Sequence, residues 1–197
     1  VTPAGLQQAA RTYLDTDKDL GVIVELLEQY EDGAHPAAPT FPADKGLGTD
    51  IVMQVGLVSD DIAAMAKRYQ AVLGLPDPFL VETPGYAITE TTFKGAPTEA
   101  TAKLAFFDFG QAQLELIQPD NIPSVWRDYL NAKGASAHHI AFRVQDTQAA
   151  VDHFAKFGIG VLQQGLYGDR SGMYTYMDSE AELGVIFELL ENFPQPR

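Results

Sequence analysis

The sequence has no cysteine and no long run of apolar residues. Its 197 residues therefore include no disulfide, no thiolate ligand for a metal ion and no thiol nucleophile. No stretch approaches the roughly 20 consecutive apolar residues that a membrane-spanning helix needs. These absences exclude thiol chemistry and a spanning helix within this sequence, and the lack of cysteine fits our expectation of a cytoplasmic protein.

Positively charged residues are also scarce. Lys and Arg together number 13 against 27 Asp and Glu, which gives a formal net charge of −14. Nucleic-acid-binding proteins carry a basic surface and anionic membranes attract basic segments, so we expect neither partner. The hydrophobic fraction of 46% is ample for a packed core. The composition thus indicates a globular protein whose partners are neither nucleic acids nor membranes.

One phrase occurs twice without a gap. The copies are Tyr13-Leu-Asp-Thr-Asp-Lys-Asp-Leu-Gly-Val-Ile-Val-Glu-Leu-Leu-Glu28 and Tyr176-Met-Asp-Ser-Glu-Ala-Glu-Leu-Gly-Val-Ile-Phe-Glu-Leu-Leu-Glu191. Such self-similarity marks a modular unit, here a turn and an apolar strand that contains one glutamate, Glu25 or Glu188. Burying an unpaired carboxylate is costly, so this glutamate needs a partner, and a metal ion would be one.

Breaks in the hydrophobic pattern divide the chain into five segments. They are a partial module (1–31), a Pro-, Gly- and Ala-rich linker (32–50), a first β-α-β-β-β module (51–119), a connecting helix (120–137) and a second β-α-β-β-β module (138–193). In the first module the pattern predicts a helix over 62–73 and strands at 51–58 and near 79–83, 86–93, 103–109 and 112–118. We therefore predict an α+β fold whose paired modules form an open, barrel-like mixed sheet around a cleft.

Four polar residues occupy matching places in the two modules. Gln54 and His139 lie in the opening strands, and Glu115 and Glu188 lie in the closing strands. If each module curls, its first and last strands project these side chains into one concavity. Oxygen ligands together with an imidazole suit a divalent ion such as Zn, Mn, Co, Ni, Fe or Mg. His138 is expected to support a ligand from behind or to be structural, because alternation along the strand directs it away from the face of His139.

Four short motifs resemble the vicinal oxygen chelate superfamily, the group that holds glyoxalase I, methylmalonyl-CoA epimerase, extradiol dioxygenases and bleomycin-resistance proteins. The motifs are Gln-Val-Gly-Leu-Val at 54–58, Leu-Glu-Leu-Ile-Gln-Pro at 114–119, His-His-Ile-Ala-Phe-Arg-Val at 138–144 and Gly-Val-Ile-Phe-Glu-Leu-Leu-Glu at 184–191. The stretch from Ser124 to Phe142 is most similar to the epimerase-type branch. The resemblance implies metal-ligand roles for the four residues named above, with Gln54 where many relatives have histidine.

The resemblance implies a metal-dependent enzyme that moves a proton next to a carbonyl, as an epimerase or isomerase of a small acyl thioester or 2-oxo compound does. Glu115 or Glu188 would act as the base, unless a separate residue such as Glu90 or Asp108 does. Two alternatives stay open. One is a glyoxalase I-type lyase or isomerase, whose ligand set these four residues match better, and the other is a metal-free small-molecule binding or resistance protein. Dimers are common in the resembled family, which is the only ground for expecting a homodimer.

Residues 1–31 resemble the end of a module without its beginning. They are either the closing hairpin of an upstream module in a longer tandem protein or strands that extend an exposed sheet edge, including that of a neighbouring subunit. Glu25 has no opening strand as a partner within the chain, so we do not count it as a ligand.

Overall fold

The computed structural model describes residues 11–27, 46–49 and 51–194. Most of the expected linker (32–50) therefore lies outside the described residues. Among the helices of the described part, none is long and apolar enough to cross a membrane.

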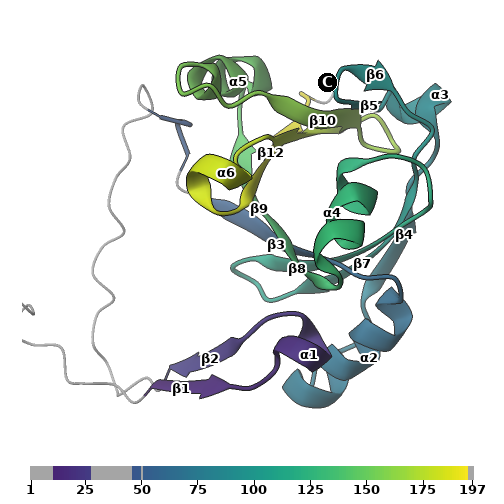
Figure 1. The fold of residues 1–197 in the computed structure, drawn as a ribbon, viewed down its shortest axis with the longest axis vertical. Coiled ribbons are helices and arrows are strands. Elements are labelled where there is room, and N and C mark those ends of the chain that lie inside the picture. The colour runs from purple at the N-terminus through teal and green to yellow at the C-terminus, as the bar shows by residue number, and fades with distance from the viewer. Residues whose placement is uncertain (1–10, 28–45, 50, 195–197) are drawn as a thin grey trace, which may run out of the picture.

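A curled ten-stranded mixed sheet forms the body of the molecule (Figure 1), with the strand order β4-β7-β8-β3-β9-β12-β11-β10-β5-β6. Its eight longer strands are β3 (Val52–Val58), β4 (Phe79–Glu82), β7 (Ala102–Asp108), β8 (Gln113–Pro119), β9 (Ser136–Val144), β10 (Val161–Leu166), β11 (Gly172–Met177) and β12 (Ile186–Asn192). At the centre β3 pairs antiparallel with β9, and each pairs in parallel with the closing strand of its own half, β8 or β12. The predicted α+β class and the open, barrel-like sheet are confirmed.

The first half departs from the predicted pattern between residues 86 and 93. The expected strand is instead helix α3 (Tyr86–Thr89) followed by the short strand β5 (Thr92–Phe93). Strand β5 pairs with β6 (Ala96–Pro97) and also with β10 of the second half. A short apolar run does not distinguish a helical turn from a strand, and here the tertiary pairing with β10 decided the outcome. The segment thereby ties the two halves together at the far end of the sheet.

Side-chain caps start the longer helices where the sequence offers them. These helices are α2 (Ile62–Leu73), α4 (Val125–Lys133) and α5 (Thr147–Ala155). Asp61, Ser124 and Asp146 each accept a hydrogen bond from a backbone N–H in the first turn, at 2.9–3.1 Å. Helix α2 ends at Gly74, whose φ of 69° is a conformation that glycine adopts at little cost.

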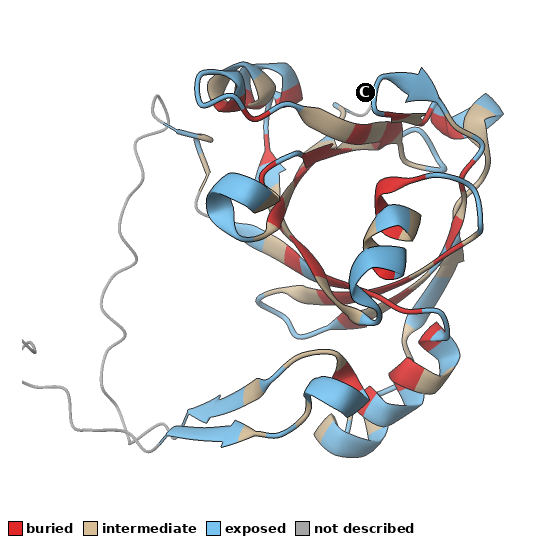
Figure 2. Ribbon diagram, in the orientation of Figure 1, coloured by how far each residue is buried: buried red, intermediate tan, exposed pale blue. Residues whose placement is uncertain are grey.

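The core is divided by the sheet into outer and inner parts. Helices α2 and α5 cover the outer faces of the two halves, while α4 lies inside the curve of the sheet (Figure 1). Figure 2 shows the buried residues along the strands of the curl and on one side of α2 and α4. Trp126 of α4 shares a core cluster with Val58 and Ile117, so this helix closes one end of the concave face.

A separate hairpin packs against the first half. It comprises β1 (Arg11–Leu14), helix α1 (Asp17–Leu20) and β2 (Val24–Leu27). Leu20 is fully buried against residues of α2, and Tyr69 Oη donates to the Leu20 carbonyl at 2.9 Å. Helix α1 therefore anchors the hairpin, whereas β1 and β2 project from the body (Figure 1).

Candidate metal centre

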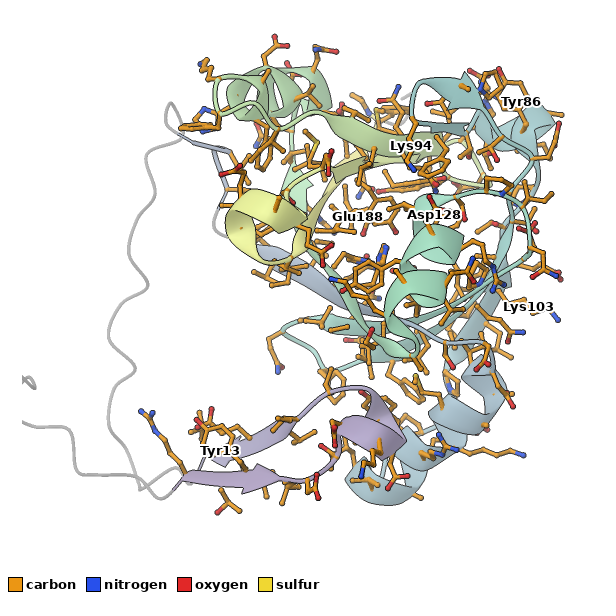
Figure 3. All side chains as sticks on the ribbon, in the orientation of Figure 1. Tyr13, Tyr86, Lys94, Lys103, Asp128 and Glu188 are labelled. Atoms are coloured by element: carbon orange, nitrogen blue, oxygen red, sulfur yellow. The ribbon has the colours of Figure 1, made fainter. Side chains whose placement is uncertain are left out.

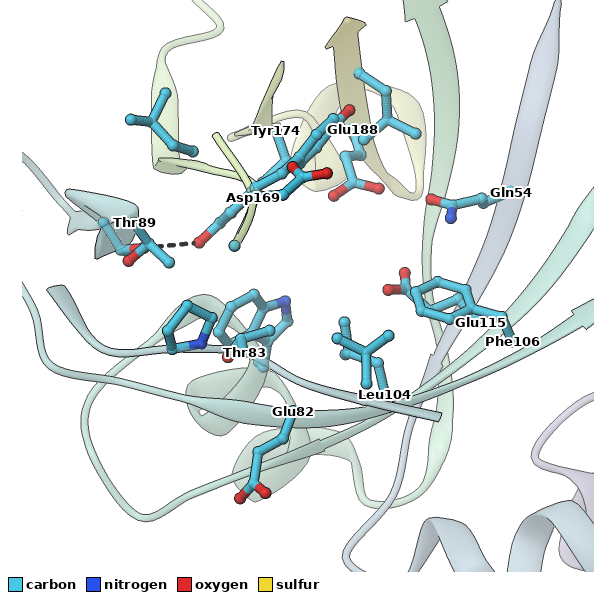
Figure 4. A pocket seen from close by; sticks show the side chains of 18 of the residues that line it. Gln54, Glu82, Thr83, Thr89, Leu104, Phe106, Glu115, Asp169, Tyr174 and Glu188 are labelled. Atoms are coloured by element: carbon cyan, nitrogen blue, oxygen red, sulfur yellow. Dashed lines mark hydrogen bonds between the residues drawn. The ribbon is translucent and has the colours of Figure 1, made fainter. Parts of the chain in front are cut away.

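Four adjacent strands, in the order β8-β3-β9-β12, carry the four predicted ligands. The structure brings Glu115, His139 and Glu188 together, because one side-chain nitrogen and one oxygen from each carboxylate lie within 4.8 Å of one another. Gln54 lies on β3 between Glu115 and His139 and lines the same cleft as the two glutamates. Figure 4 shows Gln54, Glu115 and Glu188 pointing toward a common space.

The strand register explains this convergence. Glu115 and His139 both pair with Gly56, one on each side, and Gln54 and Glu188 both pair with Ala141. Each pair of candidate ligands is therefore separated by a strand position with little or no side chain. A Cβ on Gly56 would lie 2.0 Å from the His139 ring, so the imidazole occupies the space that a side chain there would fill. Gly56 and Ala141 occupy matching places in the two opening strands, a signal that the sequence already contained.

The three clustered side chains are buried but poorly bonded to one another. His139 Nε2 lies 3.0 Å from Glu188 Oε2 and 3.3 Å from Glu115 Oε2. The distances are short, yet among the described residues neither His139 Nε2 nor Glu188 Oε2 has a hydrogen-bond partner in good geometry. Buried polar atoms are normally satisfied, so this arrangement fits groups that converge on an ion rather than bond to each other.

The charges of the cluster do not balance within the protein. Burial alone would lower the pKa of His139, but the Glu188 and Glu115 carboxylates raise it to about 10. Burial raises the pKa of Glu115, against the opposing hydrogen bond to His139. Two carboxylates around one imidazolium leave a net negative charge in a dry site. A divalent cation with a neutral imidazole would make the site neutral, so the donor set fits such an ion.

His138 does not point away from His139, so the sequence-based expectation for its direction is wrong. The pairing of β9 with β3 shifts register between the partners of Gly56 and Leu57, and His138 is the extra residue of this bulge. Both rings are buried, with their Nδ1 atoms 3.0 Å apart. Burial, and then the charge of His139, keep the pKa of His138 well below its usual value. A neutral His138 can accept the Nδ1–H of His139, which leaves Nε2 of His139 for the centre.

The cluster lies at the base of a cleft with a volume of about 510 Å³. Aromatic side chains that sequence reasoning did not assign to the site form much of its wall, namely Phe79, Phe106, Tyr167, Tyr174 and Tyr176. His139 is only 1% exposed and lies beneath the two glutamates. The repeated tyrosine of the duplicated phrase, Tyr176 in the second copy, was the available signal for this wall.

The two residues considered as a separate base do not reach the cleft. Glu90 is exposed and forms an ion pair of 2.7 Å with Arg170. Asp108 is exposed at the end of β7 and accepts from the backbone N–H of Gly110. Neither lines the cleft, so Glu115 and Glu188 are left as its buried carboxylates.

The fold and the buried cluster define a class of protein in which two β-α-β-β-β halves enclose a chelating cleft. The family model described as the Glyoxalase/Bleomycin resistance protein/Dioxygenase superfamily matches residues 53–176. The chain belongs to this superfamily, which confirms the resemblance read from its motifs.

Solved structures with the same fold include methylmalonyl-CoA epimerases. The enzyme from Mycobacterium tuberculosis is 20% identical over 78% of this chain and 97% of its own, with a TM-score of 0.52. A Streptomyces coelicolor methylmalonyl-CoA epimerase variant in complex with 2-nitronate-propionyl-CoA is 19% identical over 73% and 98%, with a TM-score of 0.52. A hypothetical protein from Bacillus halodurans is 18% identical over 74% and 96%, with a TM-score of 0.51. At these identities the similarity shows the fold alone, and none of the curated proteins compared matches the chain.

Substituting Gly56 tests whether the empty strand position holds the imidazole in place. We expect Gly56→Ala to displace His139, to lower the free energy of unfolding by about 1–3 kcal/mol and to weaken metal binding. Chemical denaturation and metal titration measure both effects. Gly160→Ala is the matched control, because a Cβ there meets nothing within 4 Å. Equal behaviour of the two variants would contradict the assignment.

The metal-free protein should lose stability as the pH rises. His139 holds its proton up to a pH of about 10 in the folded state, whereas an unfolded histidine releases it near 6.5. Between these values the folded state binds the extra proton, so the free energy of unfolding falls by up to about 1.4 kcal/mol per pH unit. Denaturation in chelator at pH 7, 8 and 9 checks this, with His139→Gln as the variant that should lose the slope. A stability that rises with pH in the wild type would refute it.

Proposed function

We propose that the protein is a metal-dependent enzyme that transfers a proton next to the carbonyl group of a small substrate, as an isomerase or epimerase. The observation that carries this proposal is the buried convergence of Glu115, His139 and Glu188 at the base of an open cleft. Ligand oxygens and an imidazole nitrogen on four adjacent strands form a rigid frame, and rigid frames hold reacting groups in position.

The four candidate ligands would hold the ion through three carbonyl or carboxylate groups and one imidazole. Gln54 Nε2 donates to Gln113 Oε1 at 3.1 Å, which directs the Gln54 amide oxygen toward the centre (Figure 4). The contact with His138 orients the His139 ring. When bound, the ion supplies a positive charge that stabilises negative charge on a substrate carbonyl oxygen.

The two glutamates are the candidate acid–base groups. Glu115 comes from the first half and Glu188 from the second, so they approach the cleft from opposite sides of the central strand pair. Burial raises the pKa of Glu115 in the metal-free protein, which favours the uptake of a proton by its carboxylate. Glu115 would remove a proton from the carbon beside the carbonyl and hold it on its carboxyl group. The same group, or Glu188 from the other side, would return a proton to the carbon.

The residues that line the cleft indicate which chemical class of substrate it would take. Aromatic and aliphatic side chains dominate, and none of the described residues that line the cleft is Lys or Arg. The cleft itself therefore supplies no cationic partner for a phosphate group. This favours a 2-oxo compound with an apolar or aromatic body over a CoA thioester.

A glyoxalase I-type reaction on a thiol adduct is a second candidate. The donor set of one amide, one imidazole and two carboxylates favours it, and the chemistry is again proton transfer next to a carbonyl. The metal-free binding protein is the alternative of a different class. It would leave the buried carboxylates of Glu115 and Glu188 to be neutralised by protonation or hydrogen bonds.

Metal uptake tests the proposal first. Purified chain treated with chelator and then supplied with Mn, Co, Ni or Zn should retain about one ion per chain. Glu188→Gln and His139→Ala should weaken retention by at least about tenfold, because each removes a donor. Glu82→Gln is the control, since Glu82 lines the cleft with its carboxylate turned away from the centre (Figure 4). A wild-type chain that retains no ion would support the metal-free binding protein instead.

Solvent deuterium exchange tests the reaction. The metal-loaded protein should incorporate deuterium beside the carbonyl of 2-oxo compounds, and Glu115→Gln should slow this by at least about 100-fold while the fold is kept. Acyl-CoA esters and thiol adducts of 2-oxo aldehydes serve as the competing substrates. Metal uptake without exchange into any of these would overturn the proton-transfer function but not the metal site.

Three further expectations stay predictions. They are the identity of the ion, the homodimer and the cytoplasmic location.

A further inference from the structure

The N-terminal hairpin β1-α1-β2 repeats the strand register of the C-terminal hairpin β11-α6-β12, where α6 spans Glu180–Leu183. Tyr13 pairs with Glu25 in the first hairpin, and Tyr176 pairs with Glu188 in the second. These residues also occupy the same places in the duplicated phrase. The two segments are therefore copies of one structural unit, down to the pairing of individual residues.

The turns of the two hairpins are bonded in the same way. The Thr16 hydroxyl donates to a carbonyl six residues later at 2.8 Å and accepts from an N–H eight residues later at 3.0 Å. The Ser179 hydroxyl makes the equivalent bonds at 2.9 and 2.8 Å. Gly21 and Gly184 end the short helices with φ values of 74° and 77°. The N-terminal copy thus has the complete fold of a closing hairpin.

The two copies differ in what covers them. Apolar side chains that are buried in the C-terminal copy are exposed in the N-terminal copy. The exposed fractions are 65% for Tyr13 against 2% for Tyr176, 65% for Ile23 against 3% for Ile186, and 49% for Leu26 against 0% for Leu189. Large apolar side chains are thus left in solvent on both faces of the hairpin, which marks it as an interaction surface. Figure 3 shows Tyr13 on the projecting hairpin and Glu188, of the C-terminal copy, inside the curl of the sheet.

The C-terminal copy shows what normally covers this hairpin. Strand β12 pairs in parallel with β9, and β11 pairs antiparallel with β10. Helix α5 joins β9 to β10 and packs over Leu189. The cover is therefore a β-α-β unit. Within residues 11–27, 46–49 and 51–194, β1 and β2 pair only with each other, so both outer edges of the N-terminal hairpin are free.

A second copy of the described chain has no such unit to offer. Its two opening strands, β3 and β9, are each paired on both sides, β3 with β8 and β9, and β9 with β3 and β12. Supplying one of them to a neighbouring hairpin would require its own closing strand to leave. The anchoring of Leu20 beside Tyr69 also fixes the N-terminal hairpin against α2 of its own chain.

We propose that β1-α1-β2 closes a third β-α-β-β-β module, whose β-α-β unit comes from a polypeptide segment outside the described residues. Its opening strand pairs in parallel with β2, its last strand pairs antiparallel with β1, and its helix covers Leu26. Glu25 is then buried as Glu188 is. The opening strand of the partner must consequently present a histidine, a cation or a further metal ligand to that carboxylate.

A chimera of the full chain tests this proposal. Residues 136–173, which contain β9, α5 and β10, are fused directly ahead of Arg11, because Arg11 is the counterpart of Tyr174 in the repeat. We expect the extension to fold onto the hairpin. Hydrogen exchange of the β1 and β2 amides should then slow by at least about tenfold relative to the unextended chain.

The controls separate docking from general stabilisation. Leu26→Lys in the chimera should abolish the added protection without affecting the unextended chain, where Leu26 is already half exposed. Val72→Lys, at another site that is 49% exposed, should leave the protection intact. Unchanged exchange in the chimera, or protection that survives Leu26→Lys, would overturn the proposal. Sedimentation of the unextended chain as a dimer that Leu26→Lys dissociates would show that a second copy covers the hairpin, which would also overturn it.

Discussion

The central constraint on this structure is the balance of charge around one buried imidazole, that of His139. Glu115 and Glu188 are both buried beside His139 at the base of the cleft, and no described Lys or Arg lines the cleft to offset them. Buried charges that lack partners destabilise a fold by several kcal/mol, so such a cluster persists only with a compensating proton or ion. Protons held on both His139 and one carboxyl group, or a divalent ion beside a neutral imidazole, would balance it. The first is lost at high pH, and the second couples the fold to metal.

Duplication of one module builds the centre. The opening strands of the two halves lie side by side at the middle of the sheet, and each is flanked by its own closing strand. A pseudo-two-fold relation follows, in which Gln54 corresponds to His139 and Glu115 to Glu188. The two halves differ at these places, because Gln54 takes the place of His139 and Gly56 takes the place of Ala141. Since Gly56 has no side chain, the His139 ring has room beside it. Strand β5 of the first half also pairs with β10 of the second half, which joins the two halves at another place.

Local signals in the sequence predicted the elements whose ends are set by local chemistry. Apolar residues at helical spacing located α2, and Gly74 ended it as expected, although its cap is Asp61 and not the expected Ser59-Asp60. Ser124 and Asp146 marked the starts of α4 and α5. Two expectations failed where tertiary pairing overrides local pattern. The stretch 86–93 became α3 and β5 because β10 offers it a partner. His138 turned toward His139 because a bulge opposite Gly56 adds a residue to β9, and simple alternation does not register such an insertion.

The sequence by itself determined the duplicated module, the α+β class and the identity of the four polar residues, because periodicity, turn residues and repetition are written in the order of the chain. Only the tertiary structure decided that three of these side chains meet within 4.8 Å of one another and that Tyr13, unlike its counterpart Tyr176, is left in solvent. Both outcomes depend on which strands become neighbours. The pairing of strands is decided by burial and by hydrogen bonds between segments that are far apart in the chain. A local sequence pattern does not show which distant segment will become the neighbour.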